Sequence, residues 1–420
     1  MNYKNIKIPQ GYKIIQSQKE KIVVPDNPII PFIIEDNTNI IHLIVKQLVN
    51  IAVKKAYDNN RKISWMDIYL GKESEKNYGK NIYLPDESIK AIEEFGIAIR
   101  GPSKYIYSSE KSIYSINFSL EKILNLYICC QKIYYFFGVP STIISPQNIN
   151  MTIFQENSED IYTGIEFQSN SLKAEKMINF LRKEIDIRKI SFTEHCGIGL
   201  KISSRPAVKR IMNYAIQYAI NNDKKSITLV HKGDIMKFTE SDFRKWGYEF
   251  AKNKFNAKFK KIKNYFEIKN PKTGKNIILQ DILIDDFLQY MQISPEKYDI
   301  IVASYLNGFY ISKILSSQIG FGTLSSKIFL GRNIVIFDNS SSYKILLKKN
   351  IDIKDNPIPI ILSSIEMLQY IGWNTSADFL MKGLSKFLSN SEISYQISGI
   401  KKNLIPLNSN EIAKHIIQNI

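Results

Sequence analysis

Three observations on the sequence predict an α/β protein with more than one lobe. Hydrophobic residues make up 44% of its 420 residues, which is enough to bury a substantial core. Short apolar, β-branched runs alternate with longer segments whose apolar residues recur every three or four positions. Neither an internal repeat nor a long low-complexity linker interrupts this alternation. Strands that alternate with helices in this way predict a sheet with some parallel pairing.

The first part of the chain contains three predicted helices and three predicted strands. Residues 39–57 place their apolar side chains on one helical face, and residues 85–95 form a short helix that begins with a proline. The run GIAIRG at 96–101 is apolar and ends in Gly-Pro, which predicts a buried strand before a turn. The other expected elements are a strand at 62–69, a helix at 118–127 and a strand at 127–137.

The stretch 226–250 offers the first functional candidate. Ser226–His231 has the alternation of a short strand, and Lys232-Gly233-Asp234 forms the turn after it. Thr239 is expected to cap the next helix, with Asp242 in the capping-box position. Lys232 therefore lies where a strand ends, a place from which α/β folds commonly present functional groups.

The last part of the chain is again mixed. The predicted helices are at 173–184, at 207–221 and, as a pair around Gly372, at 361–388. Residues 277–291 are expected to form a strand and a helix, and residues 334–337 a strand. Tyr298–Tyr310 is predicted to be a buried strand that ends at Asn307-Gly308, before a helix from Ile311.

The chain is strongly basic, with 57 Lys and Arg against 40 Asp and Glu and a net charge of +17. Lysines occur along the whole chain, in a sequence rich in Ile, Lys and Asn, so a drift of composition explains the charge as well as a binding patch does. Lys252–Lys269 interleaves lysine with aromatic residues, which suits a nucleic-acid surface or a solvated hairpin or helix face. We favour the solvated face, because long lysine side chains cover apolar surface well.

Cysteine usage and the N-terminal segment indicate a cytoplasmic protein without a membrane partner. Cys129, Cys130 and Cys196 are an odd number and lack the paired spacing of a zinc site, so we expect buried thiols. The most apolar N-terminal run, at 22–34, is short and broken by prolines, and the polar start lacks the core of a signal peptide.

Several long segments resemble one enzyme family. They are GIAIRGP (96–102), ENSEDIYTGIEF (156–167), EHCGIGLKI (194–202), LVHKG (229–233), IMKFTESDFRKWGYEFA (235–251) and NPKTGKNIILQDILIDDFLQ (270–289). Together they resemble NADP-dependent isocitrate dehydrogenase of the bacterial homodimeric type, from about residue 22 to the C-terminus. The resemblance implies an isocitrate/isopropylmalate dehydrogenase-like fold. It would have a large α/β domain at 1–126 and 320–420, a small α/β domain at 127–159 and 205–319, and a dimer clasp at 160–204.

The resemblance also implies a reaction of the tricarboxylic acid cycle. The family oxidises isocitrate with NADP and decarboxylates it to 2-oxoglutarate, using Mg²⁺ or Mn²⁺, in a site between domains that the second subunit completes. Three substrate carboxylates require cations, and a hard metal ion requires carboxylate oxygens. The matching residues are Tyr162 and Lys232 as the acid/base pair, Ser115 and Asn117 as substrate contacts, Asp285 as a metal ligand supplied across the dimer, and Asn356 and Tyr395 at the adenosine half of NADP.

Other positions depart from the family pattern where it holds its ligands. Three substrate arginines correspond to Glu121, Gln131 and Gln155, and two metal aspartates to Phe309 and Lys313. At about 1.5–3 kcal/mol for each charge-assisted hydrogen bond, the three arginines alone represent roughly 4–9 kcal/mol. The departures in the substrate and cofactor loops are Lys104 and Tyr105, Glu35-Asp36-Asn37-Thr38-Asn39, Asn339-Ser340-Ser341-Ser342-Tyr343, and Ser294.

These departures leave three hypotheses, in the order in which we rank them. The first is a degenerate family member, a pseudoenzyme with impaired or lost catalysis, kept as a homodimeric scaffold or as the partner of a paralogous subunit. The second is an active NADP-isocitrate dehydrogenase with a rebuilt site, in which Lys313 and Lys104 supply positive charge. The third is a basic moonlighting protein that binds nucleic acid through Lys252–Lys269.

Overall fold

The structure is a computed structural model that describes residues 3–16, 22–35, 39–101, 116–184, 195–320, 322, 324–339, 356–390 and 407–420. The chain divides into two compact units. Unit 1 consists of residues 1–154, 289–300 and 310–420, and unit 2 of residues 155–288 and 301–309. The predicted division into a large domain, a small domain and a clasp is a finer one, and it stays a prediction.

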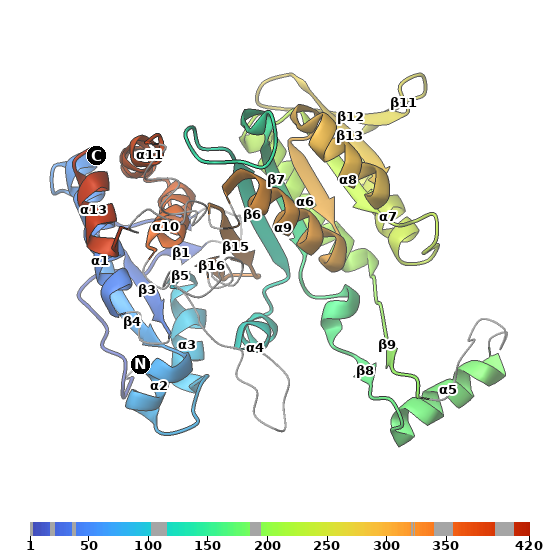
Figure 1. Ribbon diagram of the computed structural model, residues 1–420, viewed down its shortest axis with the longest axis horizontal. Helices are drawn as coiled ribbons and strands as arrows, with labels where there is room; N and C mark the ends of the chain where they lie inside the picture. Colours follow the sequence, from blue (N-terminus) through green and yellow to red (C-terminus); the bar gives the residue numbers. More distant parts are fainter. Residues whose placement is uncertain are drawn as a thin grey trace. The chain divides into compact units, whose positions relative to one another are not determined.

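Unit 1 contains a mixed sheet with the strand order β7-β6-β15-β16-β5-β3-β4 (Figure 1). Pairing is parallel between β3 and β4, β3 and β5, and β5 and β16, whereas β15 runs antiparallel to β6 and β16. This confirms the predicted α/β class with some parallel pairing. Strands β1 (Ile15–Gln16) and β2 (Ile22–Val23) form a separate antiparallel pair. The strands of the sheet are β3 (Ile29–Ile34), β4 (Ser64–Tyr69), β5 (Ile97–Arg100), β6 (Ile128–Tyr134), β7 (Asn150–Glu156), β15 (Ser326–Leu330) and β16 (Val335–Asp338).

Helices cover both faces of this sheet. Neighbouring side chains of a strand point to opposite faces, and on β3 each face meets a different helix. Phe32 contacts His42 of α1, whereas Ile33 belongs to the core cluster under α3. The last two residues of β7, Gln155 and Glu156, belong to unit 2. The helices are α1 (Asn39–Tyr57), α2 (Gly71–Tyr78), α3 (Asp86–Phe95), α4 (Ile116–Ile123), α10 (Ile358–Tyr370), α11 (Asn374–Leu388) and α13 (Ser409–Ile417), with 3₁₀ turns η1 (Pro146–Asn148) and η4 (Pro295–Lys297).

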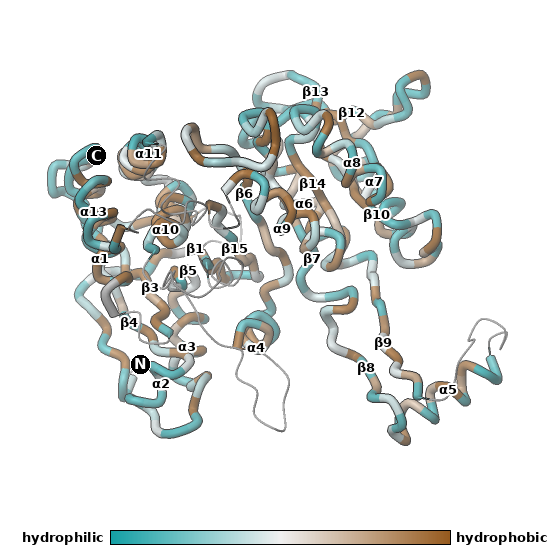
Figure 2. The backbone as a smooth tube through the Cα atoms, viewed as in Figure 1, coloured by the Kyte–Doolittle hydropathy of each residue, from teal (hydrophilic) through white to brown (hydrophobic). Residues whose placement is uncertain are grey.

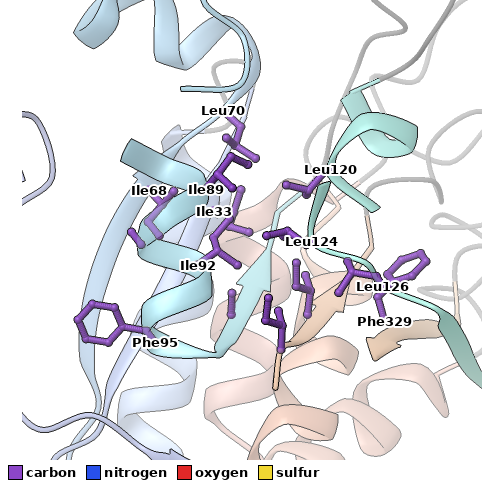
Figure 3. Packing of buried hydrophobic residues seen from close by; sticks show 14 of the residues in the cluster. Ile33, Ile68, Leu70, Ile89, Ile92, Phe95, Leu120, Leu124, Leu126 and Phe329 are labelled. Carbon is purple, nitrogen blue, oxygen red and sulfur yellow. The ribbon is translucent and has the colours of Figure 1, made fainter. Parts of the chain in front are cut away.

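The core cluster of unit 1 shows why α3 forms where it does (Figure 3). Ile89, Ile92 and Phe95 recur every third residue, so one face of the helix is apolar and packs on the sheet. Burial of each such side chain contributes about 1.5–3 kcal/mol. The helix ends at Gly96, whose left-handed backbone (φ 71°) lets its N–H donate to the Ile92 carbonyl.

Unit 2 is built on the strand order β11-β12-β13-β10-β14, in which β10 and β13 are parallel (Figure 1). The chain crosses between the two units within β7, α8, β14 and α9. The elements are η2 (Asp160–Thr163), β8 (Glu166–Phe167), α5 (Leu172–Glu184), β9 (Ile198–Gly199), α6 (Arg205–Asn221), β10 (Ser226–His231), α7 (Glu240–Phe255), β11 (Lys258–Lys260), β12 (Tyr265–Lys269), β13 (Asn276–Leu283), α8 (Ile284–Ile293), β14 (Ile300–Ala303) and α9 (Tyr305–Gly320).

The segment 160–204 differs from the rest of unit 2. Its strands β8 and β9 form a two-residue antiparallel pair, and α5 buries only Ala174 and Ile178. Figure 1 shows these elements away from the sheet of their unit. The segment exposes large apolar side chains, namely Ile161, Ile165, Leu172, Phe180, Leu200 and Ile202.

Two local predictions are wrong. Asn307 and Gly308 do not end a strand, because β14 stops at Ala303 and α9 begins at Tyr305. The buried residues Ile311, Leu315 and Ile319 recur every four positions, and this helical period outweighs the turn preference of Asn-Gly.

Thr239 does not cap α7 with its side chain. Its backbone is already in the helical region, and the Ser241 N–H donates to the Met236 carbonyl at 3.0 Å. The Met236 carbonyl therefore accepts the hydrogen bond from Ser241 N–H that a capping Thr239 side chain would otherwise accept.

The cysteine prediction is correct for two of three residues. Cys129 and Cys130 are buried in β6, whereas Cys196 is half-buried. Burial raises the pKa of Cys129 to about 12 and also raises that of Cys130. Within the part of the chain that the structure describes, no helix is long and apolar enough to cross a membrane.

Candidate functional site

Lys232 and Asp285 meet because their strands run parallel. His231 of β10 lies opposite Leu283 of β13, so both residues follow the same end of the strand pair. Lys232 Nζ forms ion pairs with the carboxylates of Asp285 and Asp234, the second at 3.1 Å. The hydrogen bonds to Asp285 and then to Asp234 raise the pKa of Lys232. The structure thus joins two residues that the resemblance assigned, and it favours the ammonium form of the lysine.

The turn that carries Lys232 is fixed by its neighbours. The Gly233 N–H donates to His231 Nδ1 at 2.9 Å, so the ring proton lies on Nε2, which donates to Asp281 at 2.9 Å. A Cβ at Gly233 would lie 2.8 Å from His231 Nδ1 and 2.9 Å from Ser241 Cα. Glycine is therefore needed for this close approach, which sets the direction in which the lysine leaves β10.

Asp281 is the centre of a polar group behind this turn. Tyr248 donates to Oδ1 at 2.5 Å, and Arg244 lies 3.5 Å from Oδ2. Burial alone would raise the pKa of Asp281, but the hydrogen bonds from His231 and Tyr248 and the charge of Arg244 outweigh it and lower the pKa. Burial and the contact with Asp281 raise the pKa of Tyr248. This group was not predicted from the sequence.

Lys201 joins the segment that carries Tyr162 to the helix after Lys232. Its ammonium contacts Asp160 and lies 2.9 Å from Glu240 Oε1, and both carboxylates are almost fully buried. Five other groups donate to these two carboxylates, namely Ile161 N at 2.8 Å, Leu306 N at 3.0 Å, Lys232 N at 3.0 Å, Ser304 Oγ at 2.8 Å and Asn307 Nδ2 at 2.8 Å. Three segments far apart in sequence are therefore held by one charge network.

Tyr162 belongs to a stack of aromatic rings. Its ring centre lies 4.0 Å from that of Tyr305 with the planes 17° apart, and the rings of Tyr305 and Phe309 are 6.1 Å apart at 16°. Tyr305 and Phe309 are four residues apart at the start of α9, so they lie on one side of the helix. The sequence predicts no role for Tyr305, so the stack is known only from the structure.

The three positions where the resemblance expects substrate arginines are buried. Gln131 Nε2 donates to Ser325 Oγ at 2.8 Å. Gln155 lies so close to α9 that a Cβ at Gly308 would come within 2.8 Å of its Cγ. Glu121 lies on α4 with 9% of its surface exposed. No cation is present at these positions, so none of them can bind a carboxylate in the bidentate manner of arginine.

Asn117, a predicted substrate contact, belongs to a buried ion cluster in unit 1. Arg100 donates to Asn117 Oδ1 at 2.6 Å, to Glu35 at 2.6 Å and to Asp338 at 2.9 Å. Burial would lower the pKa of Arg100, but the two carboxylates outweigh it and raise the pKa. Glu35, the first residue of the segment that departs from the family pattern, thus neutralises a fully buried guanidinium.

The cofactor residues are described only in part. Asn356 Oδ1 accepts from the Ile358 N–H at 3.0 Å, at the start of α10. Ser294 begins the turn η4 and makes no capping bond with its side chain. The other candidates in the substrate and cofactor loops lie outside the described residues, namely Ser115, Tyr395, Lys104, Tyr105, Asp36–Thr38 and Ser340–Tyr343.

The residues present do not fit Mg²⁺ or Mn²⁺ held as the resemblance implies. Asp285 is paired with Lys232, Phe309 has no oxygen, and Lys313 carries a positive charge. Within the described ranges of a single chain, no three His, Cys, Asp or Glu side chains lie together in a way that could hold a metal ion. We therefore derive no step through a metal.

The fold and these sequence segments place the chain in one family. Residues 37–416 match the isocitrate/isopropylmalate dehydrogenase family, and the chain belongs to it. Isocitrate dehydrogenase (NADP) of Coxiella burnetii is 40% identical over 421 residues, which cover 100% of this chain and 98% of the relative. Isocitrate dehydrogenase (NADP) of Pseudomonas aeruginosa is 38% identical over 419 residues, or 99% of each chain.

Solved structures agree on the fold. Isocitrate dehydrogenase from Methylococcus capsulatus matches with a TM-score of 0.68 and 22% identity, over 93% of this chain and 98% of that one. The TT0538 protein from Thermus thermophilus matches with a TM-score of 0.72 and 20% identity, over 97% of this chain and 71% of that one. The predicted isocitrate/isopropylmalate dehydrogenase-like fold is therefore confirmed.

Proposed function

We propose that this chain is an isocitrate dehydrogenase homologue with impaired or lost catalysis, kept as a homodimeric scaffold or as a partner subunit. The observation that carries the proposal is the ring stack of Tyr162, Tyr305 and Phe309. The resemblance expects a metal-binding aspartate at the position of Phe309, and here the Phe309 ring continues the stack of Tyr305 and Tyr162. A hard divalent ion prefers carboxylate and carbonyl oxygens, and Phe309 offers neither.

Two further features support an impaired reaction. Lys232 is held as an ammonium ion by Asp285 and Asp234, so it can donate a proton but is a poor base. The buried residues Gln131 and Gln155 cannot replace the charge of arginine. A loss of roughly 4–9 kcal/mol over three such positions corresponds to about three to six orders of magnitude in binding.

The proposed homodimer is supported by the exposed apolar side chains of segment 160–204. Leu172 is 76% exposed and Phe180 is 59% exposed, on a helix that buries only two side chains. Apolar surface of this kind marks protein interaction sites. The assignment of NADP to Asn356 and Tyr395 and the cytoplasmic location remain predictions from the sequence.

Metal binding tests the proposal without relying on turnover. We expect Mn²⁺, titrated calorimetrically in the presence of isocitrate, to give no specific binding to the natural protein. The double variant Phe309→Asp/Lys313→Asp restores two carboxylates at these positions and is expected to gain Mn²⁺ binding. Specific binding by the natural protein, abolished by Asp285→Asn, would contradict the proposal and favour the rebuilt active site.

A further inference from the structure

The edge of unit 2 carries nearly half of the net charge of the protein. Residues 252–275, which we call the basic edge, contain nine lysines and one glutamate, hence a charge of +8 out of +17. An even spread over 420 residues would place about +1 on these 24 residues. The composition of the whole chain therefore does not explain this concentration.

The structure makes this charge accessible. The basic edge comprises the end of α7, the hairpin β11–β12 and the turn before β13, and β11 is the outermost strand of the sheet. All nine lysines are exposed. Among the described residues only two of them form ion pairs, Lys260 with Glu267 at 3.3 Å and Lys275 with Asp223 at 2.5 Å.

One apolar side chain stands at the tip of the hairpin, among lysines. Ile262 is fully exposed, with a relative exposure of 101%, and stands between Lys261 and Lys263. Phe259 is 51% exposed on the neighbouring strand and packs against Phe266 with ring centres 5.0 Å apart. Figure 1 shows the hairpin projecting from its unit, and Figure 2 shows it as hydrophilic segments interrupted by hydrophobic residues.

We propose that the basic edge is a binding surface for an anionic lipid bilayer, with Ile262 inserted between the headgroups and the lysines on their phosphates. Each lysine near such a surface contributes about 1 kcal/mol. An aliphatic side chain at a protruding tip gains free energy by entering the interface, whereas the phosphates of a nucleic acid offer it no apolar contact.

The chemistry of the charges also favours a bilayer over nucleic acid. The cations of the basic edge are all lysines, which act as point charges, and the edge has no arginine for bidentate binding of phosphates or bases. Single-stranded nucleic acid is commonly held in a basic groove with exposed aromatic platforms. Here the hairpin projects, and its most exposed apolar side chain is isoleucine.

Co-sedimentation of the full-length protein with vesicles tests this proposal. We expect binding to phosphatidylcholine vesicles that contain phosphatidylglycerol, and none to phosphatidylcholine alone. The triple variant Lys260→Gln/Lys261→Gln/Lys263→Gln should bind about a hundredfold more weakly. Ile262→Ser removes no charge and should weaken vesicle binding about tenfold. Both variants change exposed side chains and should keep the thermal midpoint of the natural protein.

A matched control separates the basic edge from the charge of the whole protein. Lys80→Gln/Lys90→Gln/Lys382→Gln removes three exposed lysines of unit 1 and should leave vesicle binding within about twofold of the natural protein, because it leaves the basic edge unchanged. Equal weakening by both triple variants, or no effect of Ile262→Ser, would overturn the proposal. So would binding to single-stranded polyuridylate without binding to vesicles, which would instead assign the basic edge to nucleic acid.

Discussion

Replacement of Lys201 by methionine removes the only cation that contacts both Asp160 and Glu240 among the described residues. Methionine preserves the length of the side chain, but the two carboxylates, which are 3% and 2% exposed, lose their common partner. Breaking a buried ion pair by removing one member costs about 3–5 kcal/mol. Because both carboxylates keep other hydrogen-bond donors, we expect a loss near 3 kcal/mol at the lower end of this range.

Urea unfolding followed by intrinsic fluorescence measures this loss. The protein concentration must be held constant, because dissociation of a dimer makes apparent stability depend on it. Lys201→Arg keeps the charge and should lose less than about 1 kcal/mol. The triple variant Lys201→Met/Asp160→Asn/Glu240→Gln removes the uncompensated charges and should recover most of the stability, since asparagine tolerates the left-handed backbone of Asp160 (φ 62°). A methionine variant as stable as the natural protein, or a triple variant less stable than the single one, would refute this account of the network.

Three other predictions concern single sites. A thiol reagent should label Cys196 quickly in the native protein and should label Cys129 and Cys130 only in urea. Rapid labelling of all three cysteines in the native protein would contradict the burial of Cys129 and Cys130. Asp281→Asn should cost about 1.5–3 kcal/mol at neutral pH. The pKa of Asp281 is lowered in the folded protein, so the stability that its ionised carboxylate contributes is lost as pH falls. The destabilisation caused by Asp281→Asn should therefore shrink below about pH 4. A destabilisation independent of pH would show that the carboxylate is not ionised. Gly308→Ala places a Cβ 2.8 Å from the neighbouring glutamine side chain and should lower stability by about 1–3 kcal/mol in the same urea assay, whereas an unchanged midpoint would show that the glutamine moves freely.

The elements that the sequence predicted well are those with a clear apolar period. The helix predicted at 39–57 is α1 with the same bounds, and the strand predicted at Ser226–His231 is β10. The pair of helices around Gly372 is also present, as α10 and α11. In each case the apolar pattern of the segment itself agrees with its packing in the fold.

One helix was missed, and one boundary between a strand and a helix was misplaced. Helix α2 has the sequence GKESEKNY, which contains no apolar face. Strand β14 and helix α9 follow each other so closely that Asn307-Gly308 suggested a turn where the chain is already helical. Local propensity could not resolve a boundary that the packing of α9 determines.

The candidate site was predictable where resemblance and topology coincide. The resemblance assigns separate roles to Lys232 and Asp285, and the parallel strands β10 and β13 bring the two residues together. The network of Lys201 could not be found in this way, because Lys201 and Asp160 are 41 residues apart and each is an ordinary charged residue in the sequence. Only the fold brings these side chains together.

Isocitrate oxidation by the purified protein is the most direct test of the proposed function. NADPH formation should be followed with NADP and either Mg²⁺ or Mn²⁺, on the natural protein and on Lys232→Met. The account predicts no turnover by either protein, together with a folded dimer whose melting temperature isocitrate does not raise. Turnover by the natural protein that disappears in Lys232→Met would show that the rebuilt site works, and would contradict the account.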